Sequence, residues 1–353
     1  MIRVLLIGPL PPPVGGDTRH FETLAQDLAV NPEFTVTVFD TSRGPEHYSH
    51  LLHNLWMVCR MLTNLLRNLW RVDIVSFHSS DRGMFLMAPM LMMLARLARK
   101  PVVLRLFGGS FGDFYAAQGA FGRALSRRFI LGADVVLLQT KRLLGQLAGQ
   151  GRARLEWFST YIRPATRPPE VPATPAVRCS RFVFLGHMWR DKGIDTILQA
   201  AGNLPETIEV DLYGPLDEYT AAQLEQRGCG RVHYRGQLSR AEVDARLWDY
   251  HCLLLPTFHP GEGYPGVIAE AFAHELPVIS TRWLAIPEIV DDSCGLLIEP
   301  RDSSALVAAM RALHEDGERW QRMKLGAARR AADFDHAIWA HKFERICAEL
   351  VKT

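Results

Sequence analysis

Short apolar runs alternate with segments of helical period along almost the whole chain, and this alternation limits the possible folds more than any other feature. The runs of the first half lie at 3–7, 35–39, 73–78, 101–107 and 134–139. Those of the second half lie at 181–185, 208–213, 232–234, 252–256, 277–280 and 295–298. Such alternation predicts an α/β architecture, in which parallel strands are joined by helical crossovers.

A proline-rich stretch at 163–178 separates the two halves. Proline lacks a backbone N–H and fixes φ, so neither a helix nor a central strand is expected there. We therefore predict a first domain at 1–165, a linker at 166–180 and a second domain at 181–335. The last segment, 336–353, is expected to form a helix that packs back on the first domain.

Composition is consistent with two ordinary globular domains. The 353 residues are enough for two cores. Lys and Arg number 40 against 38 Asp and Glu, and the net charge of +2 argues against the concentrated basic surface that nucleic acid binding requires. The six cysteines are scattered without metal-ligand spacing, so no zinc site or disulfide scaffold is expected.

Membrane and export signals are also weak. The chain opens MIRVLLIGPLPPPVGG, where Gly and Pro follow a short apolar run, and this favours a buried strand and turn over a secretory leader. No stretch has the roughly 18 uncharged apolar residues of a membrane helix. The nearest, 83–95, contains Pro89 and ends before Arg96, so we expect a buried helix there. The expected location is cytoplasmic.

The segment 253–280 carries the clearest chemical signal. It reads LLLPTFHPGEGYPGVIAEAFAHELPVIS: a buried strand, a glycine-rich loop, and a helix that starts near Pro265. The start of a helix presents unpaired backbone N–H groups and a positive dipole end, which bind anions. Glycines at 261, 263 and 266 allow a phosphate to approach the backbone closely.

Two glutamates flank this helix start, Glu262 in the loop and Glu270 in the helix. Carboxylates repel phosphate, so beside a bound nucleotide they would accept hydrogen bonds from hydroxyls of ribose or sugar. A nucleotide sugar needs both kinds of contact. The alternative is that both glutamates only complement the helix N-terminus.

Three segments resemble glycosyltransferase family 4, whose members are retaining enzymes of the GT-B fold. They read PTFHPGEGYPGVIAEAFAHELPVIST, PEIVDDSCGLLIEPRD and FVFLGHMWRDKGIDTILQA. The resemblance implies two doubly wound Rossmann-like domains that face each other across a cleft. It also implies transfer of a sugar from a nucleoside diphosphate sugar to a glycan or lipid-linked acceptor. It implies no metal and no other cofactor, and the chain has no Asp-x-Asp triplet.

The resemblance also assigns residues of the second domain. Arg190 and Lys192 would neutralise the donor diphosphate, Glu262 would contact the transferred sugar, and Glu270 would bind the ribose. Further donor-binding positions are Gly263, Tyr264, Gly266, Val267 and Ile268 in the same segment, and Tyr213, Gly236 and Leu238 around the base, with Glu288 in a supporting role. His187 departs from the family, which usually has arginine there. An ordinary solvated turn is the alternative for the Arg190–Lys192 pair.

In the first domain, PPPVGGDTRH resembles the family's glycine loop between the first strand and the first helix. Gly15 and Gly16 would let the donor phosphate or the acceptor approach, although a simple strand-to-helix loop is the alternative. The family commonly has a histidine where this chain has Phe107. His78 and Asp113 are the candidates to replace it, and we favour Asp113 as the catalytic one; a backbone-satisfied histidine and a helix cap are their structural alternatives.

The segment 51–71 has helical periodicity and reads LLHNLWMVCRMLTNLLRNLWR. One stripe is apolar (51, 55, 58, 62, 65 and 69), and the opposite side carries His53, Arg60, Arg67 and Arg71. Trp56 and Trp70 broaden the apolar surface, which suits a helix on an anionic membrane. The sequence thus makes the inner face of the cell membrane a candidate partner. A domain helix with a solvated basic face is the alternative.

Two other functions remain open on the sequence. One is a GT-B nucleotide-sugar 2-epimerase, which would turn over the donor without an acceptor. The other is a catalytically idle scaffold that binds a nucleotide sugar, favoured by Phe107 and His187. The base, the sugar and the acceptor cannot be read from residue spacing, because base recognition mostly uses backbone groups.

Overall fold

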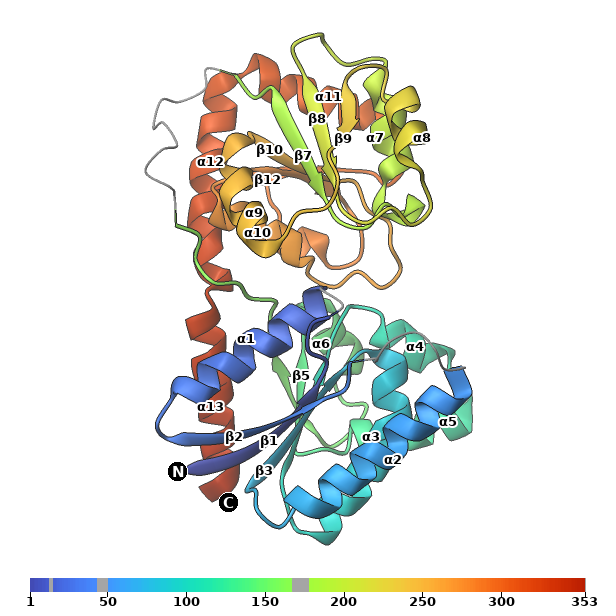
Figure 1. Cartoon of the computed structure of the whole chain (residues 1–353), viewed down its shortest axis with the longest axis vertical. Helices are drawn as coiled ribbons and strands as arrows, with labels where there is room; N and C mark the ends of the chain where they lie inside the picture. Colours follow the sequence, from blue (N-terminus) through green and yellow to red (C-terminus); the bar gives the residue numbers. More distant parts are fainter. Residues whose placement is uncertain (13–14, 43–49, 167–177, 353) are drawn as a thin grey trace. The chain divides into compact units, whose positions relative to one another are not determined.

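The computed structural model describes residues 1–12, 15–42, 50–166 and 178–352, without the side chains of 50–55. It divides into two units (Figure 1). Unit 1 contains residues 1–161 and 336–353, and unit 2 contains residues 162–335. Each unit is built around a six-stranded parallel sheet, and helices flank both sheets. Most of the expected linker, 167–177, lies outside the described residues.

Unit 1 has strand order β2-β1-β3-β4-β5-β6. Its strands are β1 (Ile2–Gly8), β2 (Phe34–Asp40), β3 (Ile74–Ser79), β4 (Val102–Leu106), β5 (Val135–Leu138) and β6 (Arg154–Trp157). Its helices are α1 (Gly16–Val30), α2 (His50–Asn68), α3 (Asp81–Leu97), α4 (Phe111–Ala117), α5 (Ala120–Leu125), α6 (Lys141–Leu147) and α13 (His336–Lys352), with a π-helical turn at Ser126–Ile130.

The two faces of this sheet have separate cores. Side chains alternate along a strand, so Leu104 of β4 packs with α2 and α3, whereas Val103 packs with α1 and α13. Both faces are covered, which explains why the inner strands β1 and β5 are buried apolar runs. Helix α13 contributes Trp339 and Phe343 to the second core.

Unit 2 has strand order β12-β11-β10-β7-β8-β9. Its strands are β7 (Arg181–Leu185), β8 (Glu209–Tyr213), β9 (Val232–Tyr234), β10 (Cys252–Leu255), β11 (Val278–Thr281) and β12 (Gly295–Ile298). Its helices are α7 (Ile194–Ala201), α8 (Ala221–Arg227), α9 (Arg240–Arg246), α10 (Gly266–Ala273), α11 (Ser303–Glu315) and α12 (Gly317–Ala331). Four 3₁₀ turns complete it, at Arg190–Lys192, Leu247–Asp249, Ile286–Glu288 and Ala332–Phe334.

The doubly wound α/β fold expected from the sequence is confirmed, and each expected strand is present with its ends at the expected residue or one residue away. The sequence pattern does not predict β6, an edge strand of four residues that begins at the exposed Arg154. Its charged residues and short length conceal it from a search for buried apolar runs.

The expected faces of the helices in unit 1 need correction. The buried row of α2 is Met57, Met61, Leu65 and Leu69, whereas Val58 and Leu62 are only half-buried. Arg60 is not on a free solvated side, because its guanidinium lies over the rings of Phe39 and Trp56, 5.0 and 5.1 Å from their centroids. The predicted positions at 51, 53 and 55 lie outside the described side chains. Helix α3 is buried on one side only, since it exposes Leu86, Met93 and Leu97.

Each sheet has one point where the strand order reverses. In unit 1 it lies between β1 and β3, and in unit 2 between β7 and β10. Loops that leave neighbouring strands there diverge to opposite faces and leave room at the carboxyl edge, which is where open α/β sheets bind ligands.

Candidate functional site

In unit 2 the loops that follow β7 and β10 meet at the reversal point. The first loop forms the Arg190–Lys192 turn and ends at Gly193, whose φ is +86°. A Cβ at Gly193 would lie 2.2 Å from the carbonyl oxygen of Pro256, so only glycine fits both the left-handed backbone and the contact. This close approach of two backbones holds the two loops together.

An ion pair joins the same two loops. Lys192 Nζ lies 2.7 Å from Glu262 Oε2, and the side chains are 17% and 8% exposed. The Thr257 hydroxyl donates to the same carboxylate oxygen at 2.8 Å. Two predicted site residues are thus brought together, and the lysine and the hydroxyl share one oxygen of the buried Glu262 carboxylate.

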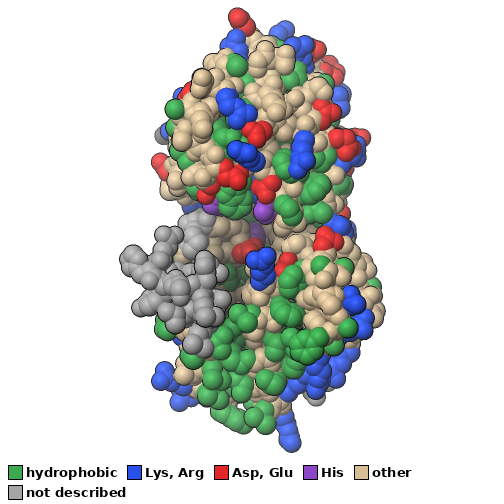
Figure 2. All heavy atoms as spheres, turned by 90° about the vertical axis from the view of Figure 1, so that its right-hand side faces the viewer, with side chains coloured by type: hydrophobic (Ala, Val, Ile, Leu, Met, Phe, Trp, Pro, Cys, Tyr) green, Lys and Arg blue, Asp and Glu red, His purple; other side chains and the backbone are tan. Residues whose placement is uncertain are grey.

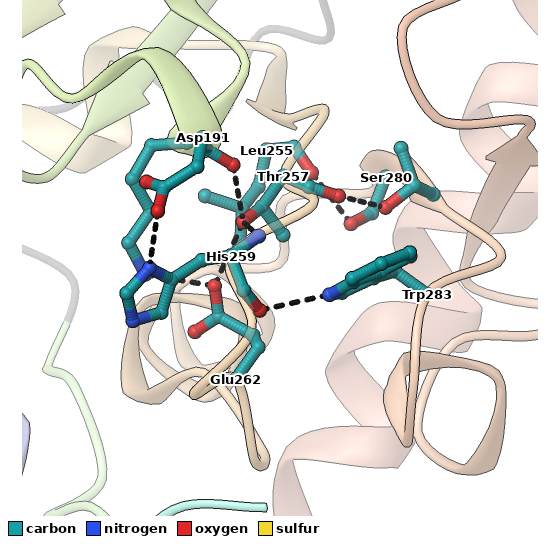
Figure 3. Close-up of polar contacts among 9 residues, drawn as sticks. Asp191, Leu255, Thr257, His259, Glu262, Ser280 and Trp283 are labelled. Atoms are coloured by element: carbon teal, nitrogen blue, oxygen red, sulfur yellow. Dashed lines mark hydrogen bonds and ion pairs between the residues drawn. The ribbon is translucent and has the colours of Figure 1, made fainter. Parts of the chain in front are cut away.

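A second carboxylate beside this pair holds a histidine (Figure 3). Asp191 Oδ2 lies 2.7 Å from Nδ1 of His259. The backbone of His259 is fixed as well, since its N–H donates to the Thr257 hydroxyl at 3.2 Å and its carbonyl accepts from Trp283 Nε1 at 2.8 Å. The loop that carries Glu262 is therefore braced from both sides.

Arg190 and His187 lie at the outer part of the first loop. The Arg190 side chain is exposed, and its backbone N–H donates to Glu218 at 2.6 Å. His187 Nδ1 lies 2.9 Å from Asp217, and its ring stacks on Trp189 at 4.5 Å between centroids. The structure thus places an imidazole bound to a carboxylate at the position where the resembled family usually has arginine.

Helix α10 begins directly after the loop, with Pro265 as the residue before its first turn. Glu270 is buried on this helix and accepts from Arg240 Nη1 at 2.5 Å. Ile268 is fully buried, so only its backbone is available to a ligand. The Tyr264 hydroxyl donates to Glu288. The interpretation of Glu288 as a supporting residue fits this contact.

The positions expected around the base are held by backbone bonds at the same edge. Gly186 N–H donates to the Tyr213 carbonyl at 3.0 Å, and Gly214 N–H donates to the Gly236 carbonyl at 2.9 Å. The Tyr213 side chain is buried and hydrogen-bonds Tyr250, so it belongs to the core. Leu238 is half-buried.

In unit 1 the reversal point holds a cavity of about 460 Å³. Its lining includes Asp17, Ser79, Ser80, Arg82 and Phe107. Burial raises the pKa of the Asp17 carboxyl to about 6, although the nearby Arg105 guanidinium opposes the rise. A polar edge over an apolar floor suits a ligand with hydroxyls on one side.

Arg105 lies beneath this region on β4 and is 1% exposed. Its guanidinium lies 4.9, 4.7 and 4.9 Å from the ring centroids of Phe107, Phe158 and Tyr161, and Nη1 donates to the Tyr161 hydroxyl at 2.8 Å. Within the described part of the chain no carboxylate comes within ion-pair distance of it. Aromatic faces therefore supply most of its stabilisation.

The predicted residues of unit 1 are less well gathered. Gly15 precedes α1, and Gly16 is its first residue. His78 is fully buried, bonds Ser76 at 2.8 Å and packs against aromatic rings, with the pKa of its imidazole lowered by burial. Phe107 is buried too. Asp113 is exposed on α4, 3.8 Å from Arg142, and does not line the cavity.

Several residues of these sites were not found from the sequence. Thr257, Asp191 and His259 brace the loop that carries Glu262, Arg240 pairs with Glu270, and Asp17 lines the cavity of unit 1. Asp17 directly follows the predicted glycine pair, so its position in the first turn of a helix was the available signal. The other four residues meet their partners only in the folded chain: Asp191 and His259, for example, follow β7 and β10, which are neighbours in the sheet. Spacing along the sequence does not reveal which strands are neighbours.

Known proteins are similar to this chain in two ways. Residues 179–316 match the family model of glycosyl transferases group 1. O-antigen chain mannosyltransferase B of Escherichia coli is 27% identical over 168 residues, which are 44% of this chain and 42% of that protein. MMP alpha-(1->4)-mannosyltransferase of Mycolicibacterium hassiacum is 28% identical over 152 residues, 40% of this chain and 36% of that protein. The chain thus matches about two fifths of the length of these relatives.

Solved structures are similar over almost the whole chain. Sucrose-phosphate synthase from Thermosynechococcus elongatus superposes with a TM-score of 0.79 at 14% identity and 99% coverage of both chains. Anabaena HepE, solved in complex with UDP, superposes with a TM-score of 0.76 at 16% identity, and the match covers 99% of this chain and 100% of the HepE chain. The GT-B fold expected from the sequence is therefore confirmed, and unit 2 carries the segment that matches group 1 glycosyl transferases.

Proposed function

We propose that this chain is a glycosyltransferase that moves a sugar from a nucleoside diphosphate sugar to a glycan or lipid-linked acceptor, in the synthesis of a cell-surface polysaccharide or glycolipid. One observation carries the proposal. The Lys192–Glu262 pair lies at the reversal point of the unit 2 sheet, just before the N-terminus of α10, inside the segment matched by the family model.

The cations and the carboxylates of unit 2 would have different roles in this reaction. A departing nucleoside diphosphate gains negative charge, which Lys192, Arg190 and the start of α10 stabilise without a metal ion. Glu262 and Glu270 accept hydrogen bonds from sugar and ribose hydroxyls. In this proposal a ribose hydroxyl replaces part of the contact between Arg240 and Glu270. The arginine side chain is exposed, so it can move aside when the ribose binds.

We propose that the reaction retains the configuration of the anomeric carbon, as the resemblance to family 4 implies. The bond from the anomeric carbon to the phosphate oxygen breaks, and a bond to the acceptor oxygen forms on the same face. The proton of the acceptor hydroxyl passes to the leaving phosphate, so charge and atoms balance.

The acceptor is assigned to the cavity of unit 1. Ser79, Ser80 and Arg82 provide donors at its edge, and Asp17 provides an acceptor. Gly15 and Gly16 lie next to Asp17 at the start of α1 and leave its approach open.

A lipid-linked acceptor would place unit 1 at a membrane surface. Figure 2 shows apolar side chains gathered over the part of unit 1 where α2, α3 and α5 lie. Trp56, Leu66, Trp70, Met93 and Leu97 are 52%, 54%, 69%, 57% and 78% exposed. Exposed arginines at 67, 71 and 99 accompany them. Among the described residues no helix is long and apolar enough to cross a bilayer.

Vesicle flotation tests the membrane contact. The chain is expected to float with vesicles that contain anionic lipid, and Trp70→Gln combined with Leu97→Gln should reduce the bound fraction severalfold. Leu325→Gln, at a 64% exposed apolar position on α12 of unit 2, serves as the comparison variant and should leave the bound fraction unchanged. Absence of binding to both anionic and neutral vesicles removes the membrane partner and leaves the transferase proposal intact.

The transfer activity is tested in two steps. A thermal-shift screen of UDP, GDP, ADP and their sugars should identify one base that raises the unfolding temperature. Glu270→Ala should then abolish transfer with that donor while the protein stays folded. Wild-type rates in this variant would refute the assignment. Donor turnover without an acceptor would indicate an epimerase, and binding without turnover would indicate a scaffold.

A further inference from the structure

His259 is more tightly positioned than a loop residue needs to be. Its Nδ1 is bound to Asp191 at 2.7 Å, and its ring lies against Trp189 at 5.6 Å between centroids and 32° between planes. Its backbone N–H and carbonyl are both hydrogen-bonded. Asp191 in turn uses only one oxygen, because its Oδ1 is buried with no partner among the described residues.

This arrangement defines what the other ring nitrogen does. The neutral imidazole carries one N–H, and the carboxylate at Nδ1 requires the proton there. Nε2 is then a hydrogen-bond acceptor, and within the described residues no donor reaches it. The proton position is thus fixed by Asp191 in the same way that a carboxylate fixes the tautomer of metal-bound histidines.

Access to Nε2 depends on a glycine. A Cβ at Gly261 would lie 3.0 Å from Nε2, closer than ordinary contact, whereas the glycine leaves that nitrogen uncovered. Figure 3 shows the ring with Nδ1 turned to Asp191 and the second nitrogen on the opposite side. The loop is built so that one nitrogen is held and the other is open.

The neighbouring group is also an acceptor. The Thr257 hydroxyl donates to the Glu262 carboxylate at 2.8 Å and accepts from the backbone N–H of His259 at 3.2 Å, so the carboxylate and the backbone that carries the imidazole form one corner of the site. Lys192, the adjacent cation, is already bound to Glu262. A corner with two acceptors binds O–H groups and disfavours a phosphate.

We propose that Nε2 of His259 accepts a hydrogen bond from a hydroxyl of the sugar that the nucleotide donor carries, and that Asp191 is the positioning residue that holds the proton of the neutral ring at Nδ1. This assignment rests on the proposed function. It makes His259 a determinant of which donor sugar is accepted, because a donor without that hydroxyl leaves the nitrogen unpaired.

Two substitutions at position 259 test the roles of Nδ1 and Nε2 separately. The amide of asparagine stands near the place of Nδ1, so His259→Asn keeps a donor for Asp191 and deletes Nε2. The amide oxygen of glutamine stands near the place of Nε2, so His259→Gln restores an acceptor there. The measurement is calorimetric binding of UDP and UDP-glucose, and of GDP and GDP-mannose, without acceptor.

For the nucleotide pair that binds the wild-type chain, His259→Asn should weaken the sugar nucleotide about fivefold to tenfold. It should change the Kd of the bare nucleoside diphosphate by less than about twofold. His259→Gln should recover most of the loss. Gly261→Ala, which covers Nε2 without a strained φ, should behave like His259→Asn. His341→Gln, at a histidine beside Glu344 on α13, is the matched control and should change neither Kd.

Deoxy analogues of the sugar identify the hydroxyl. Removing the contacted hydroxyl should cost the wild type affinity but cost His259→Asn nothing further. Equal weakening of sugar nucleotide and bare nucleotide, or no weakening of either, overturns the proposal while the transferase proposal stands. Failure of the wild type to bind UDP, GDP, ADP and every one of their sugars in the thermal-shift screen overturns both.

Discussion

The two reversal points of this molecule have the same architecture but different chemistry. In unit 2 the edge carries charged side chains paired across loops, as Lys192 with Glu262 and Arg240 with Glu270. In unit 1 one cation, Arg105, is buried among aromatic rings, and Asp17 and Arg82 line a cavity. Paired charges at one edge are suited to a ligand that is itself charged, whereas hydroxyls over an apolar floor are suited to a neutral one.

The difference also concerns rigidity. The unit 2 loops are fixed by glycine contacts and by side-chain bonds, so the proposed donor site is largely formed before a ligand arrives. Preformed dipoles and charges need no reorganisation during the reaction.

The largest effect is expected from breaking the charged pair of unit 2. Lys192→Met should lower transfer by about 100-fold or more, because the cation that stabilises the leaving diphosphate is lost. The buried Glu262 also loses its partner, so stability should fall by about 1–3 kcal/mol. Transfer assays and urea unfolding measure the two effects.

Lys324→Met is the matched control for Lys192. Lys324 pairs with Glu275 at 3.4 Å in the same unit, on a helix outside the reversal point. Its loss should leave transfer within about twofold of wild type. A similar loss of transfer in both variants would mean that Lys192 acts through stability alone.

The second effect concerns the buried cation of unit 1. Arg105→Met removes three ring contacts and the bond to Tyr161, and unfolding should require about 3 kcal/mol less free energy. Arg154→Met, at a 42% exposed arginine paired with Glu349, should cost less than about 1 kcal/mol. Equal costs at the two positions would show that the aromatic cluster adds nothing.

The smallest effect is a pH dependence at Asp17. The folded chain holds this carboxyl at a pKa of about 6, above the ordinary value of 3.8, so the folded state binds the proton more tightly. The protonated Asp17 makes its full contribution to the free energy of unfolding below about pH 4, and this contribution is lost as the pH rises through 6. Asp17→Asn should therefore stabilise the protein by about 1 kcal/mol at pH 7 and have little effect at pH 4.

Asp73 gives the contrast within the same unit. Its hydrogen bond and ion pair with Arg3 lower the pKa of its carboxyl. Asp73 therefore contributes stability above its unfolded pKa and loses it as the pH falls through the lower folded value. Asp73→Asn should destabilise at pH 7, opposite in sign to Asp17→Asn. The same sign for both variants in thermal unfolding at pH 4 and 7 would contradict this account.

The contrast also explains what the sequence revealed. The donor-side segment was recognisable because strand end, glycine loop, helix start and both glutamates are contiguous. Its partners were not, because Asp191 and His259 are joined only by the adjacency of β7 and β10. Arg105 was taken as part of an apolar strand, since nothing in its neighbours shows that aromatic rings from distant segments surround it.

Helix α2 shows a further limit. Periodicity correctly predicted a helix, but Met57 and Met61 were not placed on the buried row. Several faces of this segment are apolar, so the pattern does not specify which one the sheet covers. Packing against α3 and the sheet decides it.

Hydrogen exchange with a bound nucleoside diphosphate tests the central claim, that unit 2 holds the donor nucleotide, most directly. The full chain is compared with and without the diphosphate chosen by the thermal-shift screen. We predict the strongest protection in the loops 186–193 and 257–270, where Lys192 and the start of α10 lie. Protection confined to unit 1, with those two loops unchanged, would contradict the account.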